Sequence, residues 1–365
     1  MAARRAVVAM SGGVDSSVAA ALLVQQGYDV TGIMLKLWRG DAANHDSGCC
    51  NLGAAEDARR VSDVLGIPFY VLNMAERFED TVVRDFQDSY RRGTTPNPCV
   101  RCNQWIKFDA LLERAEALGA DVLATGHYAR VERGPRGFKL LRGRDERKDQ
   151  SYVLWMLGQD ELARCLFPVG DLEKPETRRI AAELGLRTAA KPDSQEICFV
   201  QGGDTSAYIA EHLPHASAPG AIRDRSGTVL GEHRGIGHYT VGQRKGLGIS
   251  LGAPVFVTAI DATTNSITVG SRDELQVDAL VVEETSFVAA PPAPGTRLLV
   301  QHRAHGEPAL AVVERTGNGS CALRFQDPVE AVAPGQSAAF YSADDPDELV
   351  GGGVIAAAIP ALAGV

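Results

Sequence analysis

Two glycines flanked by hydroxyl and carboxylate side chains form the most distinctive short motif, Ser11-Gly12-Gly13-Val14-Asp15-Ser16-Ser17. Residues 7–10 before it are apolar and typical of a strand, whereas residues 18–23 after it have the spacing of a helix. Glycine permits a tight turn and close approach of a ligand, and the first turn of a helix has N–H groups that need partners. The pattern predicts a phosphate site, or else an ordinary glycine turn of an α/β unit. It is neither a Walker A loop nor G-x-G-x-x-G.

Cysteines form the second set of reactive side chains. Cys99-Val100-Arg101-Cys102 follows a turn-rich loop, residues 93–98, and comes just before a predicted helix, whereas Cys198 lies far along the chain. A thiol at a helix N-terminus near Arg101 and Lys107 is expected to have a lowered pKa, which makes it a nucleophilic thiolate at neutral pH. Two such thiols that meet can support persulfide transfer and release the product by forming a disulfide.

The same cysteines also fit metal ligation. Cys99 and Cys102 have the C-x-x-C spacing of zinc and iron–sulfur ligands. Further ligands would come from Cys198, with Cys49 or Cys50. The two isolated cysteines are expected to be small buried side chains, namely Cys165 and Cys321.

A scaffold must position these motifs, and the first 200 or so residues alternate between strand and helix patterns. We predict strands at residues 28–37, 68–72 and 121–125, and helices at residues 52–65, 75–92, 106–118, 151–157 and 174–184. This alternation predicts an α/β fold, a doubly wound parallel sheet with helices on both faces. Ligands of such sheets bind beyond the carboxyl ends of the strands, where the glycine motif, Leu35 and Gly126 would lie.

The composition changes in the second half. Residues 129–149 are rich in Arg and Lys around Gly134-Pro135, which predicts a projecting basic hairpin. After about Asp204 helix patterns almost disappear, and short β-type runs separated by Gly, Pro and Asp predict small barrels. We therefore expect an α/β domain over residues 1–204 with the hairpin as an insertion, a small β-rich central domain over 205–279, a C-terminal β-barrel over 280–356 and a flexible tail over 357–365.

Composition limits the class of protein. The chain has 365 residues, 45% hydrophobic and 23% charged, as is usual for globular proteins of two or three domains. A formal net charge of −9 and a pI near 5.5 mean that nucleic-acid binding would need a local basic patch. Seven cysteines do not suggest a secreted disulfide framework. We expect no signal peptide and no membrane span, hence a reduced, cytoplasmic protein, and a monomer.

Taken together, the motifs resemble one family. Ser11 to Ser16 match the PP-loop of ATP pyrophosphatases, which split ATP between the α- and β-phosphates and transfer AMP to a substrate. The other motifs are similar to those of the tRNA-specific 2-thiouridylases. They are Gly48-Cys49-Cys50, Thr95-Pro96-Asn97-Pro98-Cys99-Val100-Arg101-Cys102-Asn103, Thr125-Gly126-His127-Tyr128, Lys148-Asp149-Gln150-Ser151-Tyr152, Asp193-Ser194-Gln195-Glu196-Ile197-Cys198-Phe199 and GIGHYTVGQRKGLG at 235–248. The resemblance runs in order from residue 6 to about residue 355.

The resemblance implies a nucleotide site and two reactive thiols. Asp15 would help to hold Mg²⁺ and pyrophosphate. Cys102 would be the nucleophile and Cys198 the carrier of the persulfide, and the two would form a disulfide during the cycle. Leu35 stands where many members have methionine. The residues implied to bind ATP are Ala9, Met10, Ser11, Gly12, Gly13, Val14, Asp15, Ser16, Leu35 and Gly126.

The resemblance also implies contacts with RNA. Asn97, Pro98 and Cys99 would lie against the target base, and some members have Asp at position 99. The extra thiol keeps open a [4Fe–4S] cluster held by Cys99, Cys102 and Cys198. Ala304 occupies a position that is often aromatic. The positions implied to contact tRNA are His127, Lys148, Asp149, Gln150, Arg303 and Gln336.

The implied reaction is adenylation of the C2 oxygen of wobble uridine 34, followed by sulfur transfer from a cysteine persulfide, giving 2-thiouridine, AMP and pyrophosphate. The implied partners are the anticodon stem-loops of Lys, Glu and Gln tRNAs and a cysteine desulfurase or sulfur-relay carrier. The basic hairpin and the Arg244-Lys245 turn would gather phosphates despite the acidic net charge. The alternatives are an iron–sulfur version of this reaction, a PP-loop ligase or amidotransferase of small molecules, and a nucleotide- or tRNA-binding module without turnover.

Overall fold

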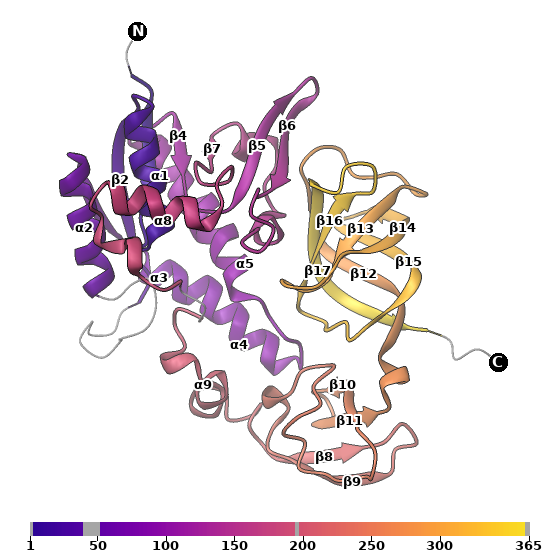
Figure 1. Ribbon diagram of the computed structural model, residues 1–365. Helices are drawn as coiled ribbons and strands as arrows, with labels where there is room; N and C mark the ends of the chain where they lie inside the picture. Colours follow the sequence, from indigo (N-terminus) through magenta and orange to yellow (C-terminus); the bar gives the residue numbers. More distant parts are fainter. Residues whose placement is uncertain (1–2, 39–51, 194–196, 362–365) are drawn as a thin grey trace. The chain divides into compact units, whose positions relative to one another are not determined.

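The computed structural model describes residues 3–38, 52–193 and 197–361, which divide into two compact units (Figure 1). The first unit contains residues 1–82, 99–203 and 347–350. The second contains residues 83–98, 204–346 and 351–365. The chain therefore passes from the second unit into the first at Pro98 and Cys99, in the middle of the predicted cysteine motif.

The first unit is built on a parallel sheet with the strand order β3-β2-β1-β4-β7. Its strands are β1 (Arg5–Ala9), β2 (Asp29–Lys36), β3 (Phe69–Asn73), β4 (Val122–Ala124) and β7 (Cys165–Leu166). Val8 pairs with Gly32 on one side and Ala124 on the other. Because the strands are parallel, their carboxyl ends lie at one edge. The predicted doubly wound sheet is confirmed.

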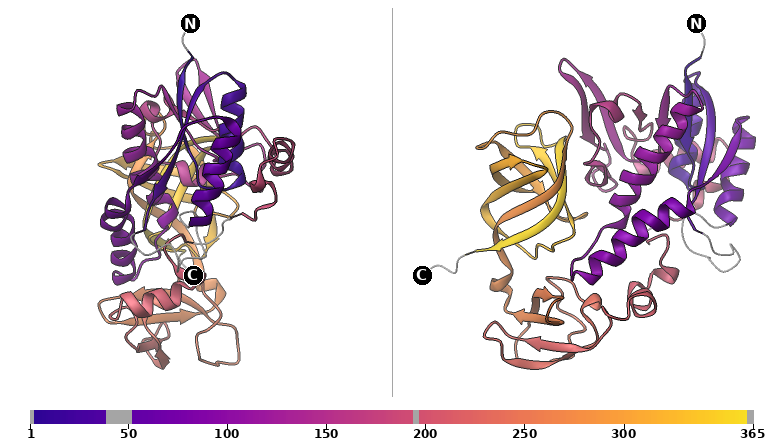
Figure 2. Two further views of the ribbon diagram at one scale, coloured as in Figure 1. Left: turned by 90° about the vertical axis from the view of Figure 1, so that its left-hand side faces the viewer. Right: turned by 180° about the vertical axis from the view of Figure 1, so that it is seen from behind.

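Helices cover both faces of this sheet, which is why Val7 and Val8 of β1 are both buried. Helices α1 (Val14–Gln25), α2 (Leu52–Leu65) and α8 (Lys174–Glu183) share one hydrophobic core with β1. Seen from behind (Figure 2, right), a continuous helix lies on the other face. It consists of α5 (Pro98–Cys102), a π-helical stretch (Asn103–Leu111) and α6 (Leu112–Ala117), so it begins at Pro98 and not at 106 as predicted.

The other predicted helices differ in detail. The helix expected over residues 75–92 is α3 (Ala75–Phe78), a π-helical stretch (Glu79–Val83) and α4 (Arg84–Arg91). The helix expected over 151–157 is one 3₁₀ turn (Ser151–Leu154), followed by the short helix α7 (Gln159–Leu162).

The predicted hairpin is confirmed as β5 (Ala129–Gly134) and β6 (Gly137–Arg142). Within the first unit, Glu348 and Leu349 pair with strand β6 of the hairpin, at Leu141 and Leu140.

The second unit begins its C-terminal part with a helix, α9 (Thr205–His212), where we expected few helix signals. Asp204 caps it by accepting a hydrogen bond from the Ala207 amide at 2.9 Å. A four-stranded sheet follows with the order β10-β11-β8-β9, and Ile222, Val257 and Ile267 form its core. Its strands are β8 (Gly220–Arg223), β9 (Val229–His233), β10 (Phe256–Asp261) and β11 (Ser266–Gly270).

The last part of the second unit is a small barrel, as predicted. The strand order is β12-β15-β14-β13-β16-β17, and pairing between β12 and β17 closes it. Strand β17 runs to Pro360, into the segment 357–365 that we expected to be a tail. The strands are β12 (Gln276–Phe287), β13 (Arg297–Gln301), β14 (Ala309–Gly317), β15 (Ser320–Glu330), β16 (Ser337–Ser342) and β17 (Glu348–Pro360).

Candidate active site

The glycine motif forms a tight turn between β1 and α1. Gly12 has a φ of +70°, and a Cβ there would collide with the backbone of Ala54 in α2, so the position requires glycine. The Ser17 hydroxyl donates a hydrogen bond to the Gly13 carbonyl at 2.8 Å, which ties the turn to the first helical residues. The N-terminus of α1, the positive end of the helix dipole, therefore lies at the carboxyl edge of the sheet, where an anion would be stabilised.

Gly126 reaches this turn from a neighbouring strand. It follows β4, and a Cβ added to it would lie 2.6 Å from the Ser16 nitrogen and 2.7 Å from the Asp15 carbonyl carbon. Leu35 is buried close to the end of β2. The structure thus brings the residues of β1, β2 and β4 that we predicted to bind ATP to the same edge of the sheet.

Asp15, in the first turn of α1, is held by a cation and a phenol. Lys174 Nζ donates to both carboxylate oxygens, at 2.7 and 2.8 Å, and the Tyr128 hydroxyl donates to Oδ1 at 2.9 Å. Lys174 is only 8% exposed. Burial, together with the charge of Asp15, raises the pKa of Tyr128 far above its usual value, so its hydroxyl keeps its proton.

The charged network continues to Asp193, which begins the motif that contains Cys198. Its carboxylate pairs with Lys148 and Lys174 at 2.8 Å and with Arg178 at 2.9 Å. Burial alone would raise the pKa of Asp193, but hydrogen bonds from Lys148 and Lys174 lower it to about 2. The sequence analysis missed Lys174 and Arg178 because they lie on α8, far from the glycine motif in the chain.

Lys191 is a second cation that the sequence analysis missed. Its Nζ donates to the Gly12 carbonyl at 3.0 Å and to Asp57 Oδ2 at 2.8 Å. An ammonium group next to the glycine turn adds positive potential where the helix N-terminus already favours an anion. Only its position just before the Pro192-Asp193 motif could have drawn attention to it.

The side chains that the structure describes do not form a ready-made ligand group for a protein-held Mg²⁺ or an iron–sulfur cluster. Both oxygens of Asp15 are bound by Lys174, as described above. Across residues 3–38, 52–193 and 197–361, no three His, Cys, Asp or Glu side chains gather as metal ligands. Cys99, Cys102 and Cys198 all lie in these ranges and do not form such a group, so we derive no step through either metal.

Cys102 is the last residue of α5, immediately before the π-helical stretch. Cys99 is exposed and Cys102 half-buried. π-Helical segments are rare and often mark functional sites. Arg101, expected to act on a neighbouring thiol, is buried with its guanidinium 4.7 Å from the centre of the Trp105 ring. The next residue, Asn103, donates to the Val153 carbonyl at 2.9 Å and anchors the helix to the segment after the hairpin.

Cys198 belongs to the same unit as Cys102 and is also half-buried. Its neighbour Phe199 packs edge-to-face against Phe78 of α3, with ring centres 5.7 Å apart. Both Cys102 and Cys198 are thiols in the structure, so the disulfide that the resemblance implies for one stage of the cycle is not formed in this state.

The two isolated cysteines are buried as expected, and burial raises the pKa of Cys165 to about 12 and that of Cys321 above its usual value. Cys49 and Cys50 lie outside the described residues.

His127, which we expected to contact tRNA, is enclosed by protein. It is 8% exposed, its Nδ1 lies 2.6 Å from Thr125 Oγ1, and the rings of Phe108 and Phe167 are centred 5.8 and 6.0 Å away. Burial, followed by the charge of Lys107, lowers the pKa of His127 well below its usual value and keeps the ring neutral. In this arrangement His127 supports the sheet edge from within.

The Lys148-Asp149-Gln150 segment, also expected at the RNA, forms the base of the hairpin. The Asp149 carboxylate accepts hydrogen bonds from Arg142 at 2.8 Å and from the Ser151 amide at 3.0 Å. Gln150 Oε1 accepts from the Tyr128 amide at 3.0 Å. Since Lys148 pairs with Asp193, all three side chains have structural partners.

The hairpin is less basic than its sequence suggests. Arg130 pairs with Asp347, just before β17, at 3.0 Å, and Lys139 pairs with Glu348, the first residue of β17, at 2.6 Å, so both cations have acidic partners. Arg142 and Lys148 also have acidic partners. The exposed basic residues of the segment are Arg133, Arg136, Arg144 and Arg147.

The two candidate RNA contacts in the barrel differ. Arg303 is exposed, in the loop after β13. Gln336 instead directs its side-chain nitrogen to the carbonyls of Thr95 and Pro96, at 2.9 and 3.2 Å. Asn97 and Pro98 follow this loop directly.

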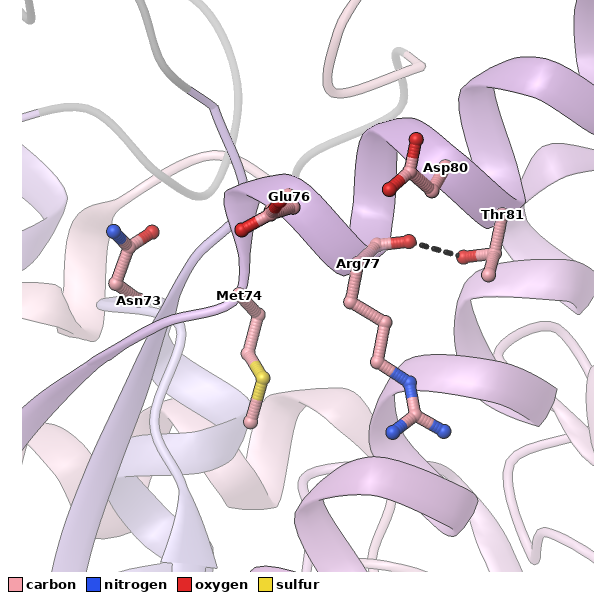
Figure 3. Close-up of a pocket in the computed structure, with 6 residues that line it drawn as sticks. All are labelled: Asn73, Met74, Glu76, Arg77, Asp80 and Thr81. Atoms are coloured by element: carbon pink, nitrogen blue, oxygen red, sulfur yellow. Dashed lines mark hydrogen bonds between the residues drawn. The ribbon is translucent and has the colours of Figure 1, made fainter.

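A cavity of about 460 Å³ lies beyond the carboxyl end of β3 (Figure 3). Among the residues that the structure describes, no site residue that we predicted from the sequence lines this cavity. Its lining is polar and carries both charges, which suits a polar ligand at the carboxyl edge of a parallel sheet. The lining residues are Asn73, Met74, Glu76, Arg77, Asp80 and Thr81.

Comparison with known proteins connects these features to a family. Three family models match in succession: a tRNA methyl transferase HUP domain over residues 4–202, a tRNA methyl transferase PRC-barrel domain over 206–271 and an aminomethyltransferase β-barrel domain over 277–355. In the part of the chain that the structure describes, no helix is long and apolar enough to cross a membrane. A match to the solved NMN synthetase of Francisella tularensis covers 57% of this chain and 73% of that chain, at 16% identity and a TM-score of only 0.32.

Curated relatives match almost the whole chain. The tRNA-specific 2-thiouridylase MnmA of Geobacter metallireducens is 47% identical over 364 residues, which is 98% of this chain and 98% of that protein. The MnmA protein of Acidothermus cellulolyticus is 49% identical over 344 residues, covering 93% and 94% of the two chains. That of Clostridium perfringens is 44% identical over 358 residues, covering 97% and 99%. With this identity over nearly full length, the chain belongs to the tRNA-specific 2-thiouridylase family.

Proposed function

We propose that the protein uses ATP to convert the wobble uridine 34 of tRNA to 2-thiouridine, with release of AMP and pyrophosphate. The observation that carries this proposal is the glycine turn at the N-terminus of α1, surrounded by Lys191 and the Lys174 network, in the same unit as Cys102 and Cys198. The anion site can bind the nucleotide that activates the substrate, and the pair of thiols can transfer sulfur. A reaction that needs both steps explains why one unit contains both features.

The activation step follows from the chemistry of uracil. The C2 oxygen is a poor leaving group, and transfer of AMP from ATP to this oxygen makes it a good one. The amides at the start of α1 and the ammonium of Lys191 stabilise the negative charge that grows on pyrophosphate. Lys174 shares its charge between Asp15 and Asp193, which holds the first turn of α1 in place.

The sulfur step uses both thiols. The terminal sulfur of a persulfide on Cys198 attacks C2, and AMP departs with the former C2 oxygen. The Cys102 thiolate then attacks the Cys198 sulfur, and the electron pair of the S–S bond passes to the sulfur on C2, which becomes the thiocarbonyl. A Cys102–Cys198 disulfide remains, and an external thiol reductant must restore the two thiols.

The three predicted domains have separate tasks in this proposal. Residues 1–204 carry out catalysis, and residues 205–279 and the barrel at 280–356 hold the anticodon stem-loop of Lys, Glu and Gln tRNAs. A cysteine desulfurase or sulfur-relay carrier loads Cys198. We further propose that the protein acts as a monomer in the cytoplasm.

The test is mass analysis of nucleosides from tRNA incubated with ATP, Mg²⁺ and a persulfide source. The wild-type protein is expected to form 2-thiouridine with AMP and pyrophosphate, whereas Cys198→Ser and Cys102→Ser form no 2-thiouridine. Cys321→Ser is the matched control, because Cys321 is buried in the barrel beside the Thr316 hydroxyl.

Two results would contradict the proposal. Release of AMP and pyrophosphate that is unchanged in Cys198→Ser and Cys102→Ser, with no 2-thiouridine formed even by the wild-type protein, would favour a ligase or amidotransferase of small molecules. No AMP or pyrophosphate from the wild-type protein would favour a binding module without turnover.

A further inference from the structure

The loop at residues 93–98 is hydrogen-bonded to two segments of its own unit that are distant in the chain, residues 334–336 and Thr240. Gln336 Nε2 donates hydrogen bonds to the carbonyls of Thr95 and Pro96, and the Thr95 amide donates to the Pro334 carbonyl at 2.9 Å. The Thr95 hydroxyl donates to Thr240 Oγ1 of the central sheet region at 3.3 Å. These bonds connect residues far apart in the chain, and all lie within the second unit.

The packing at this point is tight as well as polar. Gly335 has a φ of +91°, and a Cβ there would lie 2.9 Å from the Thr95 nitrogen and 2.9 Å from its carbonyl oxygen. At the first residue of the loop, a Cβ on Gly93 would lie 3.1 Å from Ile260 Cγ2. The loop backbone therefore has little room to move away from its hydrogen-bond partners.

Residues 334–336, which hold the loop, are themselves hydrogen-bonded to strand β17 of the barrel. The Gly335 amide donates to the Ile355 carbonyl of β17 at 2.8 Å, and the Ile355 amide donates back to the Gln336 carbonyl at 2.8 Å. Val332 and Ala333 just before it are buried. Gln336 therefore acts from a rigid base.

We propose that Gln336 is a positioning residue for thiolation, acting through the backbone of the 93–98 loop. This inference rests on the function proposed above. A glutamine amide has two N–H groups, and the Gln336 nitrogen has two acceptors in this loop, the carbonyls of Thr95 and Pro96. The loop leads directly to Asn97, expected at the target base, and to α5, which carries Cys102.

The test compares two glutamines whose side-chain nitrogens each donate hydrogen bonds to two loop carbonyls. Gln336→Glu keeps the shape of the side chain but replaces the donor with an oxygen that repels carbonyls. Gln301, in the same barrel, donates to the Arg303 and Ala304 carbonyls at 3.0 Å each, so Gln301→Glu imposes the same change on a different loop. Two quantities are measured for each protein: the single-turnover rate of 2-thiouridine formation at saturating tRNA and ATP, and the Kd for tRNA.

We expect Gln336→Glu to lower the single-turnover rate about 10- to 100-fold, since small displacements of reacting groups have effects of this size. Gln301→Glu should keep its rate within about threefold. An unchanged rate in Gln336→Glu, an increased Kd with an unchanged saturated rate, or an equal loss of rate in both variants would each overturn the proposal.

A second measurement does not depend on activity. Amide hydrogen exchange of peptides that cover residues 93–98 should become faster in Gln336→Glu and not in Gln301→Glu. Unchanged exchange in Gln336→Glu would overturn the role of Gln336 in holding the loop. If the wild-type protein forms no 2-thiouridine, the proposed function fails, and the exchange result still decides whether Gln336 holds the loop.

Discussion

Gly126→Ala is a direct test of the proposed nucleotide site, because it adds one methyl group where β4 meets the first turn of α1. The new Cβ would lie 2.6 Å from the Ser16 nitrogen, whereas ordinary contact begins at 3.4 Å, so the two backbones must separate by about 3.4 − 2.6 = 0.8 Å. Overpacking of this kind costs about 1–3 kcal/mol. If the cost appears as distortion of the ATP-binding conformation, it corresponds to a roughly 5- to 150-fold increase in the Kd for ATP.

The assay is isothermal titration calorimetry with ATP and the tRNA-free protein, together with thermal unfolding of each variant. Gly134→Ala is the matched control, since its Cβ would have 3.6 Å to the nearest atom and the residue lies in β5 of the same unit. Neither glycine has a φ in the left-handed region, so the two substitutions differ in contact and not in backbone strain.

The reasoning predicts weaker ATP binding in Gly126→Ala only. A Kd for ATP that stays within about twofold of wild type in Gly126→Ala would refute it, because a 0.8 Å separation could not leave the binding loop intact. Equal loss of affinity in Gly134→Ala would show that the effect is general destabilisation.

Three further predictions concern charge. Lys191→Met is expected to raise the Kd for ATP roughly tenfold or more, as charged hydrogen bonds contribute about 1.5–3 kcal/mol; an unchanged affinity in calorimetry would place it outside the site. Asp193→Asn should lower the free energy of unfolding near pH 7 by about 1–2 kcal/mol after solvent screening. Because folding lowers the pKa of this carboxyl to about 2, the stability difference between wild type and Asp193→Asn is fully present above pH 3.8, the ordinary pKa, and disappears as the pH falls towards 2. Urea unfolding at several pH values measures this difference. Arg136→Ala with Arg147→Ala should reduce the slope of log K against log salt for tRNA by about 2, whereas Arg179→Ala, a surface residue paired with Glu183, should not.

The glycine turn was predictable from the sequence because its signals are local. A buried strand, two glycines and a small-residue helix follow one another within about twenty residues, and each restricts the backbone independently of the rest of the chain. The hairpin and the small barrel were predictable for the same reason. The helix α9 was missed although Asp204 provides a cap, because a cap is recognised only when a periodic apolar pattern follows it.

The charge partners could not be predicted in this way. The sequence places eight basic residues between Arg130 and Lys148, which suggested a surface for RNA. The structure pairs Arg130 and Lys139 with Asp347 and Glu348, more than two hundred residues later in the chain. An ion pair leaves no periodic pattern, so its partner becomes visible only when folding brings distant segments together.

The sequence by itself determined the kind of chemistry: which residues can turn around a phosphate, which can carry sulfur, and to which family they belong. Those properties depend on residue type and on spacing over a few positions. Only the tertiary structure decided how the groups are held. Lys174 against Asp15 and Gln336 against Thr95 join residues 159 and 241 positions apart, and hydrogen bonds of this reach depend on the packing of whole units.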